Sequence, residues 1–244
     1  MQSGRRENLS PSVSRVRGGV VRAYLRAALA IYWKDVTVEA RTRDTLFGVL
    51  MFALVVAFIF KFTFDPAPRV VALIGPGIAW VAYVFAGIVG MNRTFVLERD
   101  RGTLEALLLA PVPREAIYLG KLLGAFTIMI VVEAAMLPVF LVLHDLSFLS
   151  LPFVVTAVLA TLGMAGVGTL FSAIAVHTRA RELLLPLLFL PVALPVIIAA
   201  VSATSLLQEG GGWEEVGEWL RLMLAFDIAF LVLSSWAFEF VLEE

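Results

Sequence analysis

Long apolar stretches separated by short polar breaks divide most of the chain. A helix needs about 20 apolar residues to cross the hydrocarbon core of a bilayer. Six stretches meet this requirement, and they cover about residues 46–64, 70–91, 122–143, 151–176, 183–207 and 219–238. The pattern predicts an all-α membrane protein with six transmembrane helices in a single domain over residues 20–244.

The segment before the first predicted span has a different pattern. In residues 20–43, apolar positions recur every three or four residues, which is typical of one helix face. Arg22, Arg26 and Glu39 interrupt this segment, so it is too polar to cross a bilayer. We expect an amphipathic helix lying in the membrane interface, with a cytoplasmic helix packed on a partner protein as the alternative. Residues 1–19 are rich in Arg and Ser without an apolar signal-peptide core, which predicts a disordered cytoplasmic arm.

Composition supports a membrane protein and excludes several kinds of chemistry. Hydrophobic residues make up 60% of the 244 positions, charged residues make up 16%, and the mean hydropathy is +0.93. A soluble fold of this size cannot bury so much apolar surface. The chain contains no cysteine, which excludes disulfides and thiolate metal sites. It also lacks a GxxxxGK[ST] phosphate-binding loop, so we expect no nucleotide hydrolysis by this chain itself.

The basic residues are concentrated on one side of the predicted spans. If the N-terminus is cytoplasmic, only Lys61, Arg69 and Arg221 of the 19 lysines and arginines lie outside. The opposite orientation would translocate nearly all of them, against the tendency of Lys and Arg to stay on the cytoplasmic side. We therefore expect an even number of spans with both termini in the cytoplasm.

The segment 97–113, between the second and third predicted spans, carries most of the functional information. Its charged turn, residues 98–102, is followed by Thr103, which can cap a short helix over residues 104–110 with Glu105 in the first turn. The apolar edge of this helix consists of Leu104, Leu107 and Leu108, and the prolines that end it are Pro111 and Pro113. A short helix of this kind fits a groove on a cytoplasmic protein. The alternative is a solvated loop whose leucines dip into the bilayer.

Three sequence patterns resemble one known family. RDRGTLEALLLAPVP, residues 99–113, resembles the coupling helix of type-2 ABC exporter permeases and is most similar to the CcmB family (haem exporter protein B). That family reads approximately D-G-[ST]-L-E-x-L-L-L-[SA]-P-x-P at this place. The run PGIAW, residues 76–80, is similar to the start of the family's second span, and the prolines of residues 185–195 are similar to its fifth. The Arg-rich arm before residue 20 departs from the family.

The resemblance implies a type-2 permease fold and a defined set of partners. They are a second copy of this chain, a cytoplasmic ABC ATPase subunit (CcmA-like), a haem-handling membrane subunit (CcmC-like) and a small CcmD-like subunit. Such a complex acts in cytochrome c maturation in the bacterial inner membrane, where the ATPase binds ATP and a haem chaperone acts indirectly. It implies no cofactor on this chain and no nucleic-acid partner. The implied ATPase-coupling residues are Glu98, Arg99, Arg101, Gly102, Thr103, Leu104, Glu105, Leu108 and Pro111.

Two ionisable residues fall inside predicted spans, Glu133 in the third and Asp227 in the sixth. Charged groups at such depth are costly, so they usually face protein or water and are candidates for function. Glu133 either borders a cavity at a dimer centre, pairs with a polar group of another span, or is a neutral carboxyl hydrogen-bonded within the bundle. Asp227 lies near Arg221 in sequence, which favours a structural role. His144, just outside the third span, is interpreted as a solvated residue rather than a haem ligand.

Two alternative functions are consistent with the same sequence. One is a type-2 ABC exporter permease for a drug, a lipid or a polysaccharide. The other is a membrane scaffold that assembles the haem-handling subunits without transporting anything. Exporters of the first kind usually carry a larger extracytoplasmic segment than the short loops predicted here, which favours haem handling.

Overall fold

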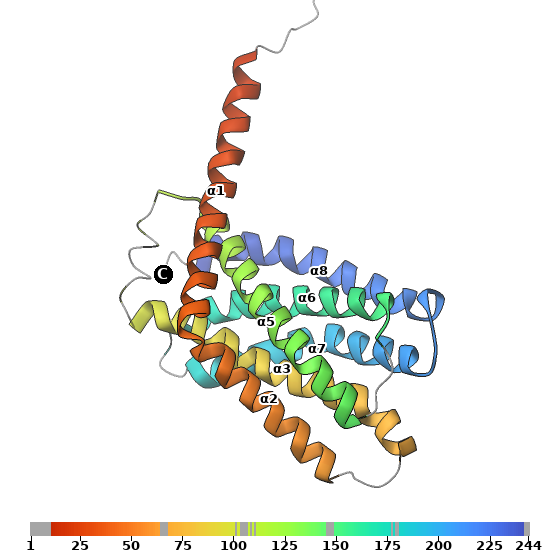
Figure 1. Cartoon of the computed structure of the whole chain (residues 1–244). Coiled ribbons are helices and arrows are strands. Elements are labelled where there is room, and N and C mark those ends of the chain that lie inside the picture. The colour runs from red at the N-terminus through yellow and green to blue at the C-terminus, as the bar shows by residue number, and fades with distance from the viewer. Residues whose placement is uncertain are drawn as a thin grey trace, which may run out of the picture.

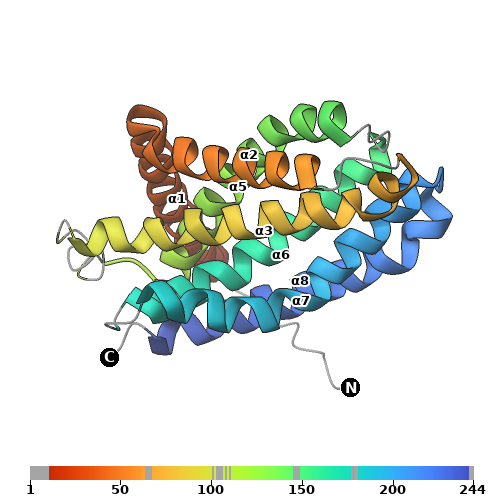
Figure 2. The same ribbon diagram turned by 90° about the horizontal axis from the view of Figure 1, so that it is seen from below.

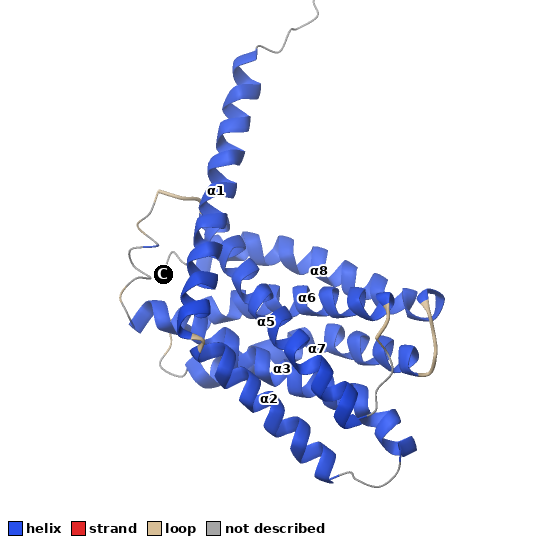
Figure 3. Cartoon of the chain, in the orientation of Figure 1, coloured by secondary structure: helices blue, strands red, loops and turns tan. Residues whose placement is uncertain are grey.

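The structure is a computed structural model that describes residues 11–63, 68–100, 111–144, 149–176 and 181–241, together with Gly102, Leu107, Leu109 and Thr178. Within these ranges it contains only helices and connecting turns (Figure 3). The helices are α1 (Pro11–Thr42), α2 (Asp44–Thr63), α3 (Pro68–Asp100), α5 (Arg114–His144), α6 (Leu151–Val176), α7 (Arg181–Gln208) and α8 (Trp213–Val241). The predicted all-α class is confirmed for this part of the chain.

Helices α2, α3 and α5 to α8 form a bundle around α6. Helix α6 contacts α3, α5, α7 and α8, and Figure 2 shows it between α3 and the α7–α8 pair. In α6, 72% of the apolar span is buried, against 17% in α2, because α6 is covered on all sides and α2 lies at the edge of the bundle. Helix α1 runs across the direction of the bundle and its first half projects beyond it (Figure 1).

Five helices in the described residues are long and apolar enough to cross a membrane. Their spans are Leu46–Thr63, Leu73–Met91, Arg114–Leu141, Leu151–Ala175 and Leu183–Gln208. They correspond to the first five predicted spans. Helix α8, the predicted sixth, is not among the five, although it packs along α6 and α7. Its first turn is acidic, with Glu214 and Glu215, and Asp227 lies farther along it.

The first helix is longer than predicted. It begins at Pro11, so the expected disorder of residues 11–19 is wrong, while residues 1–10 lie outside the described part of the chain. Proline fits the first turn of a helix because its missing N–H has no partner there in any case. Between Pro11 and the end of α1 no second proline interrupts the backbone hydrogen bonds. Low hydropathy therefore excluded a span in this region but did not exclude a helix.

A sharp turn joins α1 to α2. Arg43, between the two helices, has φ of 56°, in the left-handed region that non-glycine residues seldom adopt. Its N–H donates to the Glu39 carbonyl at 2.7 Å, and the N–H of Leu46 donates to the Glu39 carboxylate at 2.7 Å. Glu39 thus caps the start of α2, which explains why α2 leaves α1 abruptly.

Two helices extend past the spans predicted for them. Helix α3 continues to Asp100, so residues 98–100 are helical and the predicted charged turn is wrong there. Helix α5 begins at Arg114 rather than near residue 122. Hydropathy marks where a helix meets lipid, whereas the backbone hydrogen bonds continue into water wherever the sequence permits.

Candidate coupling site

The predicted coupling segment begins inside α3. Glu98 and Arg99 lie in the last turn of this helix, and Gly102 follows in an exposed turn with φ of 65°. Glycine adopts this left-handed conformation at little cost, which is why it commonly ends helices. Arg101, Thr103, Leu104, Glu105 and Leu108 lie outside the described residues, so their coupling role stays a prediction.

The described remainder of the segment packs against the bundle. Leu107 is helical and half-buried, and Val112 is also half-buried. Leu109 is 85% exposed, and Pro111 is exposed. Leu107, expected on an apolar edge facing a partner, therefore contributes to the protein's own packing, whereas Leu109 faces outward.

Leu107 and Val112 pack on a compact set of buried side chains that we call the junction cluster. Its members are Ile31, Ile117, Tyr118, Leu122, Leu170, Ala173 and Phe238. The Tyr118 hydroxyl donates to the Gly166 carbonyl at 3.2 Å, and its ring lies 5.3 Å from that of Phe238. The cluster joins α1, α5, α6 and α8, so the segment before α5 packs on a set of side chains drawn from four helices.

Helices α1 and α5 approach each other closely beside this cluster. A Cβ atom added at Gly120 would lie 2.7 Å from the Ala28 carbonyl oxygen and 2.8 Å from the Ile31 Cβ. One turn farther along α5, Gly124 faces the Asp35 side chain, with 3.5 Å between an added Cβ and the Asp35 Cβ. Small residues at such crossings let two backbones approach within membranes.

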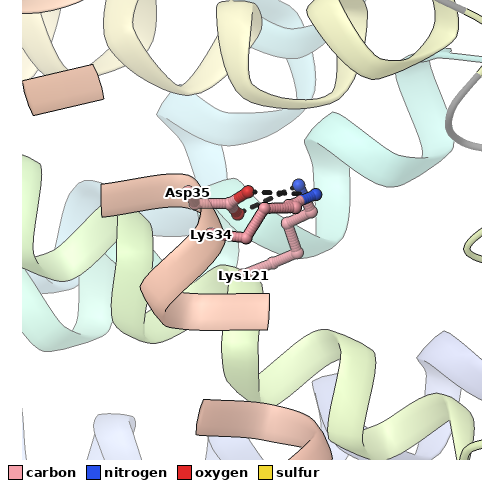
Figure 4. Close-up of polar contacts among 3 residues, drawn as sticks. All are labelled: Lys34, Asp35 and Lys121. Atoms are coloured by element: carbon pink, nitrogen blue, oxygen red, sulfur yellow. Dashed lines mark ion pairs between the residues drawn. The ribbon is translucent and has the colours of Figure 1, made fainter. Parts of the chain in front are cut away.

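An ion pair lies at the same crossing (Figure 4). The Lys121 Nζ is 3.0 Å from the Asp35 Oδ2, and the Lys34 Nζ is 3.2 Å from the Oδ1. Lys121 is 1% exposed and Asp35 is 12% exposed, whereas Lys34 is 45% exposed. Sequence reasoning missed this pair because it assigned Lys121 to a loop. The spacing of Lys121 from Ile117 and Tyr118, one helical turn earlier, would have indicated that it shares their helix face.

A second polar group lies within the bundle and includes Glu133. The Thr161 hydroxyl donates to the Glu133 Oε2 at 2.9 Å, and the Tyr83 hydroxyl lies 3.1 Å from the same Thr161 oxygen. Because the single Thr161 proton is donated to Glu133, Tyr83 is the donor in the second bond. Glu133 of α5 is therefore hydrogen-bonded to α6, which agrees both with pairing to a polar group of another span and with a neutral carboxyl hydrogen-bonded within the bundle.

Glu133 also borders a pocket between α3, α5, α6 and α7, with a cavity volume of about 40 Å³. Aromatic and aliphatic side chains form most of its wall: Trp80, Tyr83, Met136, Leu137, Phe140 and Phe153. At its rim the Trp80 indole N–H donates to the Thr204 hydroxyl at 2.9 Å, which joins α3 to α7. Sequence reasoning identified Trp80 only as part of a motif, and it missed this contact.

Replacing Thr161 tests the polar group around Glu133. Thr161→Val removes the hydroxyl that both Glu133 and Tyr83 contact, so we expect a destabilisation of about 1–3 kcal/mol from buried polar atoms left unpaired. Thr156→Val is the matched control because the buried Thr156 hydroxyl bonds, among the described residues, to the Pro152 carbonyl of its own helix alone. Thermal unfolding in detergent measures both. Equal midpoints for the two variants would contradict a stabilising role for the polar group.

Asp227 has different surroundings. It is 1% exposed, and within the described part of the chain neither carboxyl oxygen has a hydrogen-bond partner. Arg221, expected nearby, is exposed and donates its Nε–H to the Gly217 carbonyl at 3.1 Å. Asp227 instead lies against Gly163 of α6, where an added Cβ would collide with its Oδ1.

Comparisons with known proteins identify the family of this chain. The family model "CcmB protein" matches residues 26–244. "Heme exporter protein B" of Paracoccus denitrificans is 28% identical over 209 residues, covering 85% of this chain and 94% of the relative. The protein of the same name from Rhodobacter capsulatus is 33% identical over 156 residues, covering 62% of this chain and 71% of the relative. That from Haemophilus influenzae is 27% identical over 210 residues, covering 86% of this chain and 94% of the relative. The chain therefore belongs to the CcmB family.

Proposed function

We propose that this chain is the permease subunit of an ABC transporter complex that handles haem in cytochrome c maturation. The observation that carries the proposal is the family match, which covers the whole helical bundle and the segment 97–113. The relatives' shared name, "Heme exporter protein B", supports haem as the compound that the complex handles. A separate ATPase subunit supplies the energy, since the sequence contains no phosphate-binding loop.

The proposed topology has six spans in the bacterial inner membrane, with both termini in the cytoplasm. Helix α8 is the sixth span because it packs along α6 and α7 over its length (Figure 1). Helix α1 lies in the cytoplasmic interface. This placement is supported by its direction across the bundle and by its outward-facing Leu25, Leu29 and Trp33, which are 47%, 55% and 68% exposed.

In the proposed mechanism, the segment 97–113 inserts into a cleft of the ATPase. Closure of the ATPase around ATP pushes on residues 103–110, and Pro111 and Pro113 transmit the displacement as a stiff joint into α5. The packing of Leu107 and Val112 on the junction cluster supports this route, because any displacement of the segment acts directly on that cluster. The Glu98 and Arg99 end of α3 forms the opposite border of the contact surface.

The proposed assembly contains two copies of this chain, two CcmA-like ATPase subunits, a CcmC-like subunit that holds haem and a small CcmD-like subunit. In this assembly the chain transmits force and binds no cofactor itself. ATP hydrolysis then leads to release of haem or of a haem chaperone on the extracytoplasmic side.

Reversing the charge or polarity of the coupling segment tests the mechanism. Leu104→Asp and Glu105→Arg each remove a contact proposed to lie in the centre of the ATPase interface. Such central contacts are worth about 2 kcal/mol or more, so the amount of co-purified ATPase is expected to fall by about tenfold or more. Membrane insertion is expected to be unchanged, and ATP-dependent release of the haem chaperone is expected to be lost.

Leu149→Asp serves as the matched control because Leu149 is exposed before the start of α6, outside the segment 97–113. This variant is expected to retain the ATPase. Normal co-purification and normal chaperone release in both Leu104→Asp and Glu105→Arg would overturn the proposed mechanism.

A further inference from the structure

The α1–α5 crossing combines two features that differ in their physical effect. At Gly120 the backbone of α5 lies directly against the Ala28 carbonyl and the Ile31 side chain of α1. At Lys121 and Asp35, a cation and an anion meet in a place that is nearly closed to solvent. The first feature brings the two helices close together, and the second makes the crossing specific for one register.

A buried ion pair is not an efficient source of stability. The cost of removing two charges from water offsets much of their attraction, and apolar pairs of similar volume are often equally stable. Its effect on geometry is greater, because a slide that separates the two charges removes their attraction while the lysine stays buried. An apolar contact between helices in lipid has no comparable penalty, since the lipid tails replace it with contacts of the same kind.

The crossing also lies on the route from the coupling segment to the rest of the molecule. Lys121 follows the start of α5 at Arg114 by about two helical turns. Ile31 of α1 and Ile117 of α5 belong to the junction cluster on which Leu107 and Val112 pack. A displacement that enters α5 at its first residues therefore reaches the ion pair before it reaches the middle of the span.

We propose that the Asp35–Lys121 ion pair is a positioning element that holds the interfacial helix α1 in one register on α5, so that a displacement of the coupling segment moves both helices together. This inference rests on the proposed function, in which the segment before α5 is the part that the ATPase moves. In the absence of the pair, α5 still responds to the ATPase, but α1 no longer follows it.

The absence of cysteine from the sequence allows spin labels to be placed by single substitutions. Suitable exposed positions are Leu29 on α1, Val131 on α5 and Ile198 on α7. Pulsed electron paramagnetic resonance measures the distance between labels on α1 and α7, and between labels on α5 and α7. The two distances report the movements of α1 and of α5 separately. The measurements use the complex with its ATPase in lipid nanodiscs, with and without ATP.

The test variant is Asp35→Leu combined with Lys121→Met, which replaces the ion pair with apolar side chains and is expected to keep the thermal stability. In the wild type, ATP is expected to change both distances. In the double variant, the α5–α7 change is expected to persist and the α1–α7 change to be lost. Lys34→Met is the matched control because it removes only the exposed lysine from the same carboxylate, a contact of little energetic value.

The charge-exchanged variant Asp35→Lys with Lys121→Asp keeps opposite charges at the crossing, and it is expected to recover at least part of the α1–α7 change. A double apolar variant that responds to ATP as the wild type does would overturn the inference. A wild-type complex in which neither distance responds to ATP would instead contradict the proposed function. The two failures are therefore distinguishable.

Discussion

Gly120→Leu is expected to detach α1 from α5. Even a Cβ at this position would lie 2.7 Å from the Ala28 carbonyl oxygen, and this neighbour is backbone, so no side-chain rotation relieves the contact. Inserting atoms into close-packed interiors costs about 1–3 kcal/mol and occasionally more. We expect a cost at or above the top of this range, because a leucine adds three further carbons to an already overlapping Cβ.

Two measurements check this expectation. The midpoint of thermal unfolding in detergent is expected to fall, and trypsin is expected to cleave faster at Arg22 and Arg26, which are exposed on α1. Gly48→Leu in α2 is the control because nothing lies within 4 Å of a Cβ added there. If Gly120→Leu matched Gly48→Leu in both measurements, the close crossing of α1 and α5 would be wrong.

The apolar spans were predictable because lipid selects them by one simple property. Any helix that crosses the hydrocarbon core without water needs a long apolar run, and α2 to α7 meet this condition in the sequence alone. Helix ends follow another rule, since charged residues such as Glu98 and Arg99 are good helix formers outside the bilayer. The extension of α3 to Asp100 was therefore not visible in hydropathy.

The polar contacts could also be predicted only in part from the sequence. A carboxyl at the position of Glu133 needs a partner in the membrane, so pairing with another span could be predicted. The identity of that partner could not, because it depends on which face of α6 turns Thr161 toward α5. The Lys121–Asp35 pair was harder still, since counting charges by loop treats each basic residue as solvated and ignores the helix face it occupies.

The effects of substitutions at Asp227 and Gly163 on stability are expected to depend strongly on each other in a double-mutant cycle. Gly163→Ala places a methyl group against the Asp227 Oδ1, and this carboxyl has little freedom because it is fully buried between α6 and α8. We expect a cost of about 1–3 kcal/mol for Gly163→Ala in the wild type. Asp227→Ala alone is expected to be neutral or stabilising, because it removes carboxyl oxygens that have no hydrogen-bond partner in the described residues.

In the Asp227→Ala background, the same Gly163→Ala change is expected to cost much less, since the atom it would strike is gone. Val196 and Phe226 remain near the added methyl group. Val196, at 3.3 Å, needs to move by only a few tenths of an ångström, and Phe226, at 3.5 Å, is at an ordinary contact distance. The coupling energy between the two sites is therefore expected at about 1–2 kcal/mol, within the range for residues in direct contact. The midpoints of thermal unfolding of the four proteins measure this coupling energy. Gly77→Ala is the control, because nothing lies within 4 Å of a Cβ at Gly77 and its effect should simply add to that of Asp227→Ala. Additive midpoints for Gly163→Ala and Asp227→Ala would mean that Asp227 does not face Gly163, and would place this carboxyl elsewhere in the bundle.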